Sequence, residues 1–169
     1  MVQVFAAEWN KGPVAVKRLD DLLRTEPAET KQKLLDDLLA EAGIMAALRH
    51  PNIVMFMGIC TSPPSIITEL CAKGSLYDVL QEAKRDPASL PWSQRLHMAI
   101  GAAQGLHQLH CHTPPIIHRD LKSLNVLVDK DGNAKVIFAL NEVVSVGWPC
   151  HPNPRPHSRH RLPTLISPR

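Results

Sequence analysis

The segment from Ile117 to Val128 places a carboxylate, a cation and an amide at the spacing that phosphoryl transfer requires. That reaction needs a carboxylate near the attacking hydroxyl, a cation near the γ-phosphate and oxygen ligands for magnesium. Asp120 can orient or accept the hydroxyl proton, Lys122 can reach the transferred phosphate, and Asn125 can offer its side-chain oxygen to the metal. The plainer alternative is a turn with a surface ion pair, but the apolar residues that follow as a strand favour the chemical interpretation.

Earlier in the chain, a lysine on a predicted strand and a glutamate on a predicted helix are expected to form an ion pair. Val14–Lys17 alternates and is β-branched, which predicts a strand. Residues 30–48 are predicted to form a helix, because apolar residues recur every three or four positions: Leu34, Leu38, Met45 and Leu48. Glu41 falls on the same face, where an acid is costly unless a cation meets it. Lys17 is the expected cation, and the alternative is that Glu41 borders the apolar face and points to water.

With these motifs, residues 4–136 resemble part of a eukaryotic protein kinase domain of the tyrosine-kinase-like, Raf-like group. The catalytic-loop motif and the strand lysine match the family pattern. Four further segments carry the resemblance: Leu48–Val54, Phe56–Cys60, Ile66–Cys71 and Gly74–Asp78. Independently of the resemblance, Gly74–Asp78 predicts the start of a helix, with Ser75 as N-cap and Asp78 as the capping-box acid three residues later. Lys122 and Ser123 resemble the serine/threonine-specific form of the loop.

The resemblance implies an ATP site with magnesium as its metal. Lys17, paired with Glu41, would hold the α- and β-phosphates. Thr68 would be the gatekeeper, and the backbone of Glu69 and Cys71 would hydrogen-bond adenine. Three apolar residues would enclose the adenine ring: Val4, Ala15 and Leu127. An internal spine would include Met45, Phe56 and His118.

The chain departs from the family at its start. Val4–Trp9 matches only the end of the glycine-rich loop, and Gly12 lies in Asn10–Pro13, which is typical of a turn between strands. That loop covers the phosphates with backbone amides, so we expect ATP binding to be weakened.

A second departure is at Lys135–Leu140, where the family has Asp-Phe-Gly. Without a gap, Phe138 takes the place of the aspartate; with a one-residue deletion, Phe138 and Ala139 take the places of the phenylalanine and glycine. Neither alignment restores the metal-binding carboxylate. The nearby acids Asp129 and Asp131 have a turn composition and are expected to face water, and Glu142 lies too far along.

The segment 147–169 differs from everything before it. It holds six prolines and four arginines and no acid, a composition that predicts an extended or disordered tail. The abrupt change favours translation past a splice junction near Val136, so we expect a domain truncated at both ends. A diverged natural end is the alternative.

Composition agrees with this division. The chain has 169 residues, with 19 Lys plus Arg, 16 Asp plus Glu and a formal charge of +3. Without the four arginines of the tail, 15 basic residues face 16 acidic ones, so the basic balance belongs to the tail.

Four irregularly spaced cysteines indicate neither a disulfide framework nor a zinc site, and no segment is predicted to span a membrane. The histidines of 97–112 are interpreted as the polar side of a helix rather than as metal ligands. A cytoplasmic location is expected.

The predicted architecture is an α+β, two-lobe kinase fold that is incomplete. Because the later large-lobe helices are lacking, Ile100, Leu106 and Leu109 are expected to be partly uncovered. Residues 1–138 form the partial domain, with a small lobe over 1–68 and the hinge, first large-lobe helices and catalytic loop over 69–138; residues 139–169 form the tail. By family, the function is ATP-dependent phosphorylation of serine or threonine in proteins, with this chain inactive as it stands. The alternatives are a pseudokinase module that binds weakly to nucleotide or docks on other kinases, and a tail that binds groove-forming domains or nucleic acid. The tail has a single aromatic residue, Trp148, and is ranked last, so the expected partners are protein substrates and other kinases, without nucleic acid or membrane.

Overall fold

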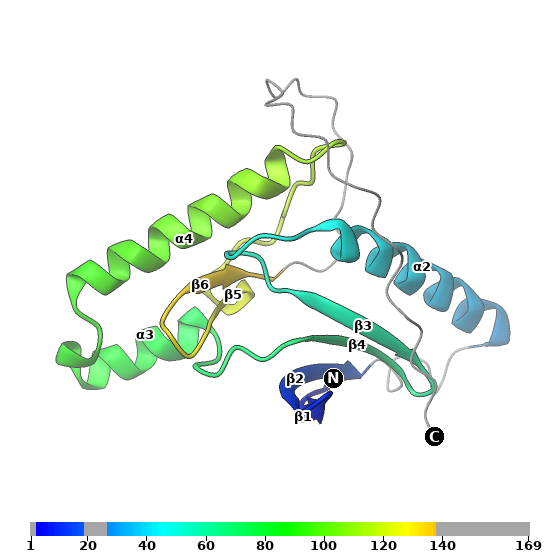
Figure 1. The fold of residues 1–169 in the computed structure, drawn as a ribbon, viewed down its shortest axis with the longest axis horizontal. Helices are drawn as coiled ribbons and strands as arrows, with labels where there is room; N and C mark the ends of the chain where they lie inside the picture. Colours follow the sequence, from blue (N-terminus) through cyan, green and yellow to red (C-terminus); the bar gives the residue numbers. More distant parts are fainter. Residues whose placement is uncertain (1–2, 19–26, 138–169) are drawn as a thin grey trace. The chain divides into compact units, whose positions relative to one another are not determined.

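The computed structural model describes residues 3–18 and 27–137 (Figure 1). These residues divide into two units. Unit 1 holds the described residues up to 49 and the segment Met55–Leu70. Unit 2 holds His50–Val54 and the residues from Cys71 to 137. The predictions for Phe138, Ala139, Glu142 and 147–169 lie outside the described residues.

Unit 1 is an antiparallel sheet with one long helix. Its elements are β1 (Gln3–Trp9), β2 (Gly12–Arg18), α2 (Ala28–Ala47), β3 (Phe56–Thr61) and β4 (Pro64–Glu69). The strand order is β1-β2-β4-β3, and α2 packs along β3. The buried apolar side chains come from all of these elements except β1: Val14, Ala42, Met45, Phe56, Ile59, Ile66 and Ile67. The mixed helix-and-sheet fold predicted from the sequence is confirmed.

A tight turn joins β1 to β2 and fixes the register of the first hairpin. Asn10 and Lys11 both have positive φ, at 51° and 63°. Two consecutive left-handed residues are typical of a type I′ turn, whose twist matches that of the flanking strands. The turn predicted here is confirmed, but Gly12 is the first residue of β2 and pairs with Trp9.

Unit 2 is built from two helices and a short hairpin. Its elements are α3 (Leu76–Arg85), η1 (Pro87–Ser89), α4 (Trp92–His110), η2 (Ser123–Asn125), β5 (Val126–Val128) and β6 (Ala134–Val136). One apolar cluster joins them, with Leu90, Met98, Val126, Val128 and Ala134 among its buried members. The predicted N-cap is confirmed, because the Ser75 hydroxyl accepts from the Asp78 amide at 3.2 Å and the Asp78 carboxylate accepts from the Ser75 amide.

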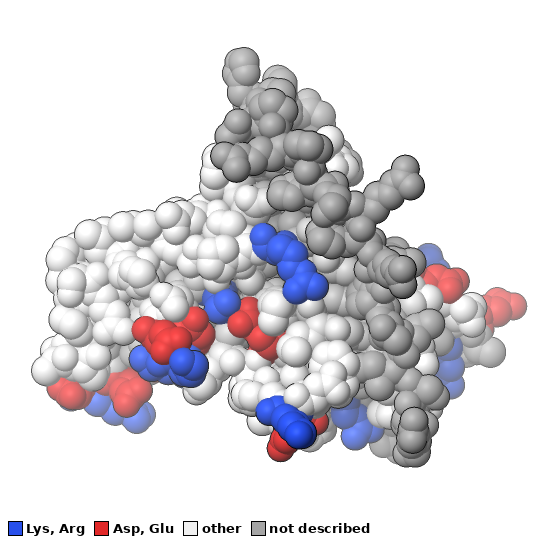
Figure 2. Space-filling view, in the orientation of Figure 1, with Lys and Arg blue, Asp and Glu red and all other residues white. Residues whose placement is uncertain are grey.

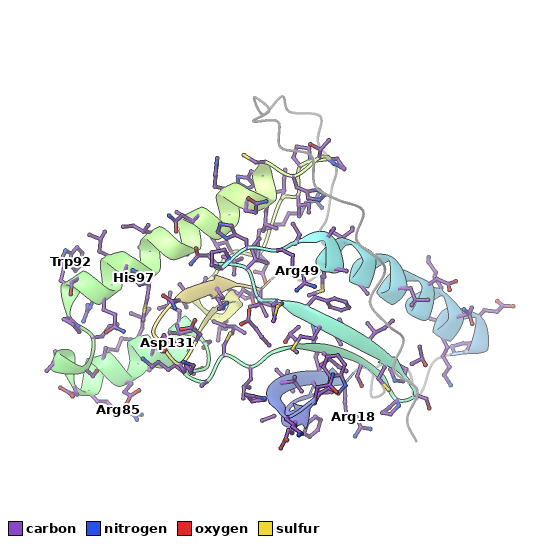
Figure 3. The ribbon with its side chains drawn as sticks, in the orientation of Figure 1. Arg18, Arg49, Arg85, Trp92, His97 and Asp131 are labelled. Atoms are coloured by element: carbon purple, nitrogen blue, oxygen red, sulfur yellow. The ribbon has the colours of Figure 1, made fainter. Side chains whose placement is uncertain are left out.

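Helix α4 has one buried face and one apolar exposed face. Met98, Gly101, Gly105 and Leu109, spaced by three or four residues, are buried. Our expectation that Leu109 would be partly uncovered is wrong, because it belongs to this face and has 0% exposure. Ile100 is exposed as expected, and Leu96 and Trp92, one and two turns before it on α4, are exposed too. Figure 3 labels Trp92 near the start of this helix. Arg95 is the only Lys, Arg, Asp or Glu in α4, and the surface over α4 is white in Figure 2.

The segment 52–54 lies beside β6 and forms a parallel β-bridge with it, between Ile53 and Val136. Val54 N–H donates to the Val136 carbonyl at 2.9 Å, and Val136 N–H donates to the Asn52 carbonyl at 2.8 Å. The Asn52 side-chain amide also donates to the Ala134 carbonyl at 2.9 Å. This close packing on α4 requires Gly105, because a Cβ there would lie 2.3 Å from the Asn52 carbonyl oxygen.

None of the helices in the described ranges is long and apolar enough to cross a membrane.

We expect Gly105→Ala to lower the free energy of unfolding by about 1–3 kcal/mol, because the new methyl group must displace a backbone carbonyl that is itself hydrogen-bonded. The matched control is Gly43→Ala in α2, where a Cβ meets nothing within 4 Å. This change should raise stability by about 0.5–1 kcal/mol, since alanine loses less backbone entropy than glycine. Urea unfolding of both variants measures the difference, and equal effects at the two sites would contradict it.

Candidate active site

Asp120, Lys122 and Asn125 meet in the loop that precedes β5. The Lys122 ammonium lies 2.5 Å from Asp120 Oδ2. Asn125 Nδ2 donates to the same Oδ2 at 2.9 Å and to the Asp120 carbonyl at 2.8 Å. The three residues that the sequence singled out for chemistry are therefore in direct contact, and the carboxylate is partly open to solvent, where a hydroxyl can approach it.

The loop backbone is held in an unusual conformation. Arg119 has a φ of 55°, in the left-handed region, and the Asp120 amide donates to the His118 carbonyl at 2.7 Å. The Asn125 amide donates to the Lys122 carbonyl at 2.8 Å. A non-glycine residue at positive φ is uncommon and strained. The tight turn points Asp120 back toward Lys122 and Asn125.

The end of the hairpin secures the loop at two points. Ile137 N–H donates to the Asn125 carbonyl at 3.0 Å. The Ile137 carbonyl lies 3.0 Å from Nε2 of His118, so this nitrogen must carry a proton and donate it. His118 is buried, with 5% exposure, and its hydrogen bond links the loop to the residue that follows β6.

The charged neighbours of Asp120 keep it ionised. The Lys122 ammonium, hydrogen-bonded to the carboxylate, lowers the pKa of Asp120 below its ordinary value, and the Asn125 amide acts in the same direction. A carboxylate that must orient a hydroxyl near neutral pH has to be ionised, and this arrangement provides that state.

Unit 2 also carries the predicted residues Cys71 and Leu127. Leu127 lies in β5 and forms a bridge with Ser75, so β5 runs beside the segment that follows Cys71. Lys73 N–H donates to the Val128 carbonyl at 3.1 Å, and Val128 N–H donates to the Gly74 carbonyl at 2.9 Å. Cys71 is buried, and its carbonyl accepts from the Gly74 amide at 3.1 Å.

In unit 1 the strand register brings four predicted residues to one face of the sheet. Val4 pairs with Lys17, and Ala15 pairs with Thr68. Directly paired residues point to the same side, and so do residues two apart on a strand. Val4, Ala15, Lys17 and Thr68 therefore share a face, although Val4 is 63% exposed.

Glu41 and Glu69 are the remaining predicted residues of unit 1, and only the contacts of Glu69 are described. Glu41 lies in α2, but its side chain is outside the described part, so the predicted pair with Lys17 stays a prediction. Glu69 makes a double contact with Met55 that the sequence gave no reason to expect. Its amide donates to the Met55 carbonyl at 2.9 Å, and its Oε1 accepts from the Met55 amide at 2.7 Å.

Asn125 fits the part of one magnesium ligand. Its nitrogen faces Asp120, which leaves Oδ1 as the atom that can bind a hard cation. The two acids of the hairpin turn are engaged elsewhere. Asp129 Oδ1 accepts from the amides of Asp131 and Asn133, both at 2.9 Å, and Asp131 pairs with Lys130 at 3.0 Å. The prediction that these acids belong to a turn agrees with this geometry.

Asn52 was not predicted from the sequence, although it binds β6, which leads into the loop contacts of Ile137. The available signal was the pair Gly101 and Gly105, spaced by four on a predicted helix. Such a pair indicates a close approach of another backbone, but it does not identify the segment that approaches.

Comparison with known proteins identifies the family. Residues 2–146 match the family model described as protein tyrosine and serine/threonine kinase. The chain therefore belongs to the protein kinase family. It is 44% identical over 135 residues to serine/threonine-protein kinase CTR1 of Arabidopsis thaliana, with 79% of this chain and 16% of that protein covered. These matches confirm the resemblance to the protein kinase family, and the relatives are named as serine/threonine-protein kinases.

Two Dictyostelium discoideum proteins, both named as probable serine/threonine-protein kinases, are also similar. One is 45% identical over 149 residues, which cover 86% of this chain and 14% of that protein. The other, drkD, is 41% identical over 146 residues, which cover 85% of this chain and 11% of that protein. The chain thus spans a small part of the relatives that it matches.

We expect Lys122→Ala to raise the pKa of Asp120 toward the ordinary carboxyl value, because the largest influence that lowers it is removed. Lys130→Ala is the matched control, since it removes a lysine that pairs with Asp131 instead. Carbon-detected NMR titration of the Asp120 carboxyl measures the effect. An identical titration in wild type and Lys122→Ala would mean that the ion pair does not form in solution.

Proposed function

We propose that the chain carries the catalytic loop of an ATP-dependent kinase that acts on serine or threonine hydroxyls of protein substrates. The observation that supports this most directly is the contact of Asp120 with both Lys122 and Asn125. In the proposed reaction Asp120 orients the substrate hydroxyl and accepts its proton, and Lys122 neutralises charge on the transferred phosphate. Family membership supports protein phosphorylation as the reaction class.

We propose further that the chain binds ATP through the residues that the sequence singled out for it. Val4, Ala15 and Leu127 would enclose the adenine, and the backbone of Glu69 and Cys71 would hydrogen-bond it beside the gatekeeper Thr68. Lys17, supported by Glu41, would bind the α- and β-phosphates, and Asn125 would offer an oxygen to magnesium. The shared face of Val4, Ala15, Lys17 and Thr68 supports this assignment.

Phosphotransfer by this chain is proposed to be very weak, because the sequence has no acid where the family places its second magnesium ligand. Phe138 follows Ile137 at that point. Asn125 alone leaves the metal with one neutral protein ligand, whereas magnesium at such sites is held through carboxylates and substrate phosphates. A nucleotide-binding or docking module without catalysis is the second candidate, and the same observation favours it.

We expect the purified chain to show no magnesium-dependent phosphotransfer above the level of Asp120→Ala. Electrostatic stabilisation and positioning provide most of this catalysis, and one metal ligand is lacking. Transfer of radiolabelled phosphate from ATP to a generic protein substrate is the measurement. Activity that disappears in Asp120→Ala would show that the chain is catalytic as it stands and that another acid holds the metal.

A variant with an aspartate at position 138 distinguishes two causes of weak activity. One is the lack of a second metal ligand, and the other is a defective nucleotide site. Phe138→Asp should strengthen ATP binding in magnesium by about tenfold or more over binding in EDTA, since a carboxylate adds a charged ligand. Phe138→Asn is the matched control, because asparagine has the shape of aspartate without its charge. It should change the magnesium dependence of ATP binding little. Isothermal titration calorimetry provides the affinities. If Phe138→Asp gives no magnesium dependence, the assignment of Asn125 as metal ligand is wrong.

A further inference from the structure

His50 is placed to sense protons at the segment that anchors β6. Its Nδ1 lies 3.1 Å from the backbone nitrogen of Asn52. The backbone N–H can only donate, so Nδ1 must accept and cannot carry a proton in this bond. Protonation of Nδ1 would abolish the bond and leave the amide of Asn52, a residue with 9% exposure, without its partner.

The rest of Asn52 has no freedom to compensate. Its side-chain amide is bound to the Ala134 carbonyl, and its own carbonyl to the Val136 amide. On the other side, α4 approaches so closely that a Cβ at Gly101 would lie 2.7 Å from Asn52 Nδ2. A change at the Asn52 amide must therefore be transmitted to β6 or disrupt the pairing with it.

From β6 a short path of bonds leads to the catalytic loop. Ile137 follows Val136 directly, its amide binds the Asn125 carbonyl, and its carbonyl accepts from His118. Asn125 in turn binds the carboxylate of Asp120. The path from His50 to Asp120 consists of hydrogen bonds and the peptide bond between Val136 and Ile137, all within unit 2.

We propose that His50 is a proton-sensitive latch: neutral His50 holds the segment 52–54 against β6, and its protonation loosens the hairpin that positions the catalytic loop. The proton comes from solvent and binds Nδ1, the atom that accepts from the Asn52 amide. The proposal concerns regulation of the loop and does not depend on whether the chain transfers phosphate.

The surroundings of His50 all lower its pKa. Partial burial lowers the pKa of His50, and the nearby His107 on α4 and Lys135 on β6 lower it further. Arg49 precedes it in the chain, and the other α4 residues at the cavity that His50 lines, such as Gln104 and Gln108, are uncharged. Among these described neighbours, none is an acid that would stabilise the imidazolium.

The sign of the pH effect follows from the lowered pKa. Unfolded His50 has the ordinary pKa of about 6.5, so between that value and the lower folded pKa the unfolded chain binds more protons. The stabilising contribution of His50 is therefore present above about pH 6.5 and is lost as the pH falls through the folded pKa. The latch is closed at neutral pH and opens on acidification.

Hydrogen exchange followed by NMR on the wild-type chain tests the latch. Protection factors, which correct for the intrinsic pH dependence of exchange, should fall about fivefold or more for the amides of Asn52 and Val136 between pH 7.5 and 5.5. The Hε1 resonance of His50 should titrate over the same range, with a midpoint below 6.5. A midpoint at or above 6.5, or amide protection that does not follow it, would overturn the proposal.

Two variants separate the latch from general acid destabilisation. His50→Asn retains an acceptor at the position of Nδ1 but cannot be protonated, so protection of Asn52 and Val136 should become independent of pH over this range. His110→Asn, which changes a histidine on α4 outside the groups that act on His50, should behave as wild type. If His50→Asn loses protection on acidification as the wild type does, the latch is refuted. If it does not fold, the wild-type titration decides alone.

Discussion

The pairing of segment 52–54 with β6 is the constraint on which the catalytic loop depends. β5 and β6 are three residues each, and an isolated two-stranded hairpin of that length is marginal in water. The segment 52–54 supplies backbone partners on the open edge of β6, and α4 covers the hairpin because glycine allows its close approach. The resulting small sheet ends at Ile137, which fixes Asn125 and His118.

Within the loop, one carboxylate is shared between a cation and an amide. The Lys122–Asp120 pair is substantially open to solvent, and exposed pairs contribute little to stability. Lys122 can therefore leave Asp120 for a more highly charged phosphate at small cost, whereas Asn125 remains attached through a second bond to the Asp120 carbonyl. The geometry thus combines a movable cation with a fixed amide, which suits their different roles in the proposed reaction.

Local patterns in the sequence predicted the elements and the loop, but not the long-range contacts. The strand at Lys17, the α2 and α4 helices, the Ser75 cap and the Asn10–Lys11 turn follow from periodicity and capping chemistry, which act over a few residues. The meeting of Asp120, Lys122 and Asn125 could be anticipated because they lie within six residues. Asn52 and Ala134 are 82 residues apart, and no period in either segment links them. The full burial of Leu109 was also not predicted.

The structure changes how the residue at 138 should be interpreted. From the sequence, the hairpin after the catalytic loop has one evident purpose, which is to place a metal-binding acid opposite Asn125. In the structure it also holds Asn125 and His118 through Ile137 and receives Asn52 through β6. These bonds use backbone groups and residues before 138, so they do not require an acid to follow. Retention of the hairpin is therefore explained by the stability of unit 2 and is not by itself evidence that an acid once followed it.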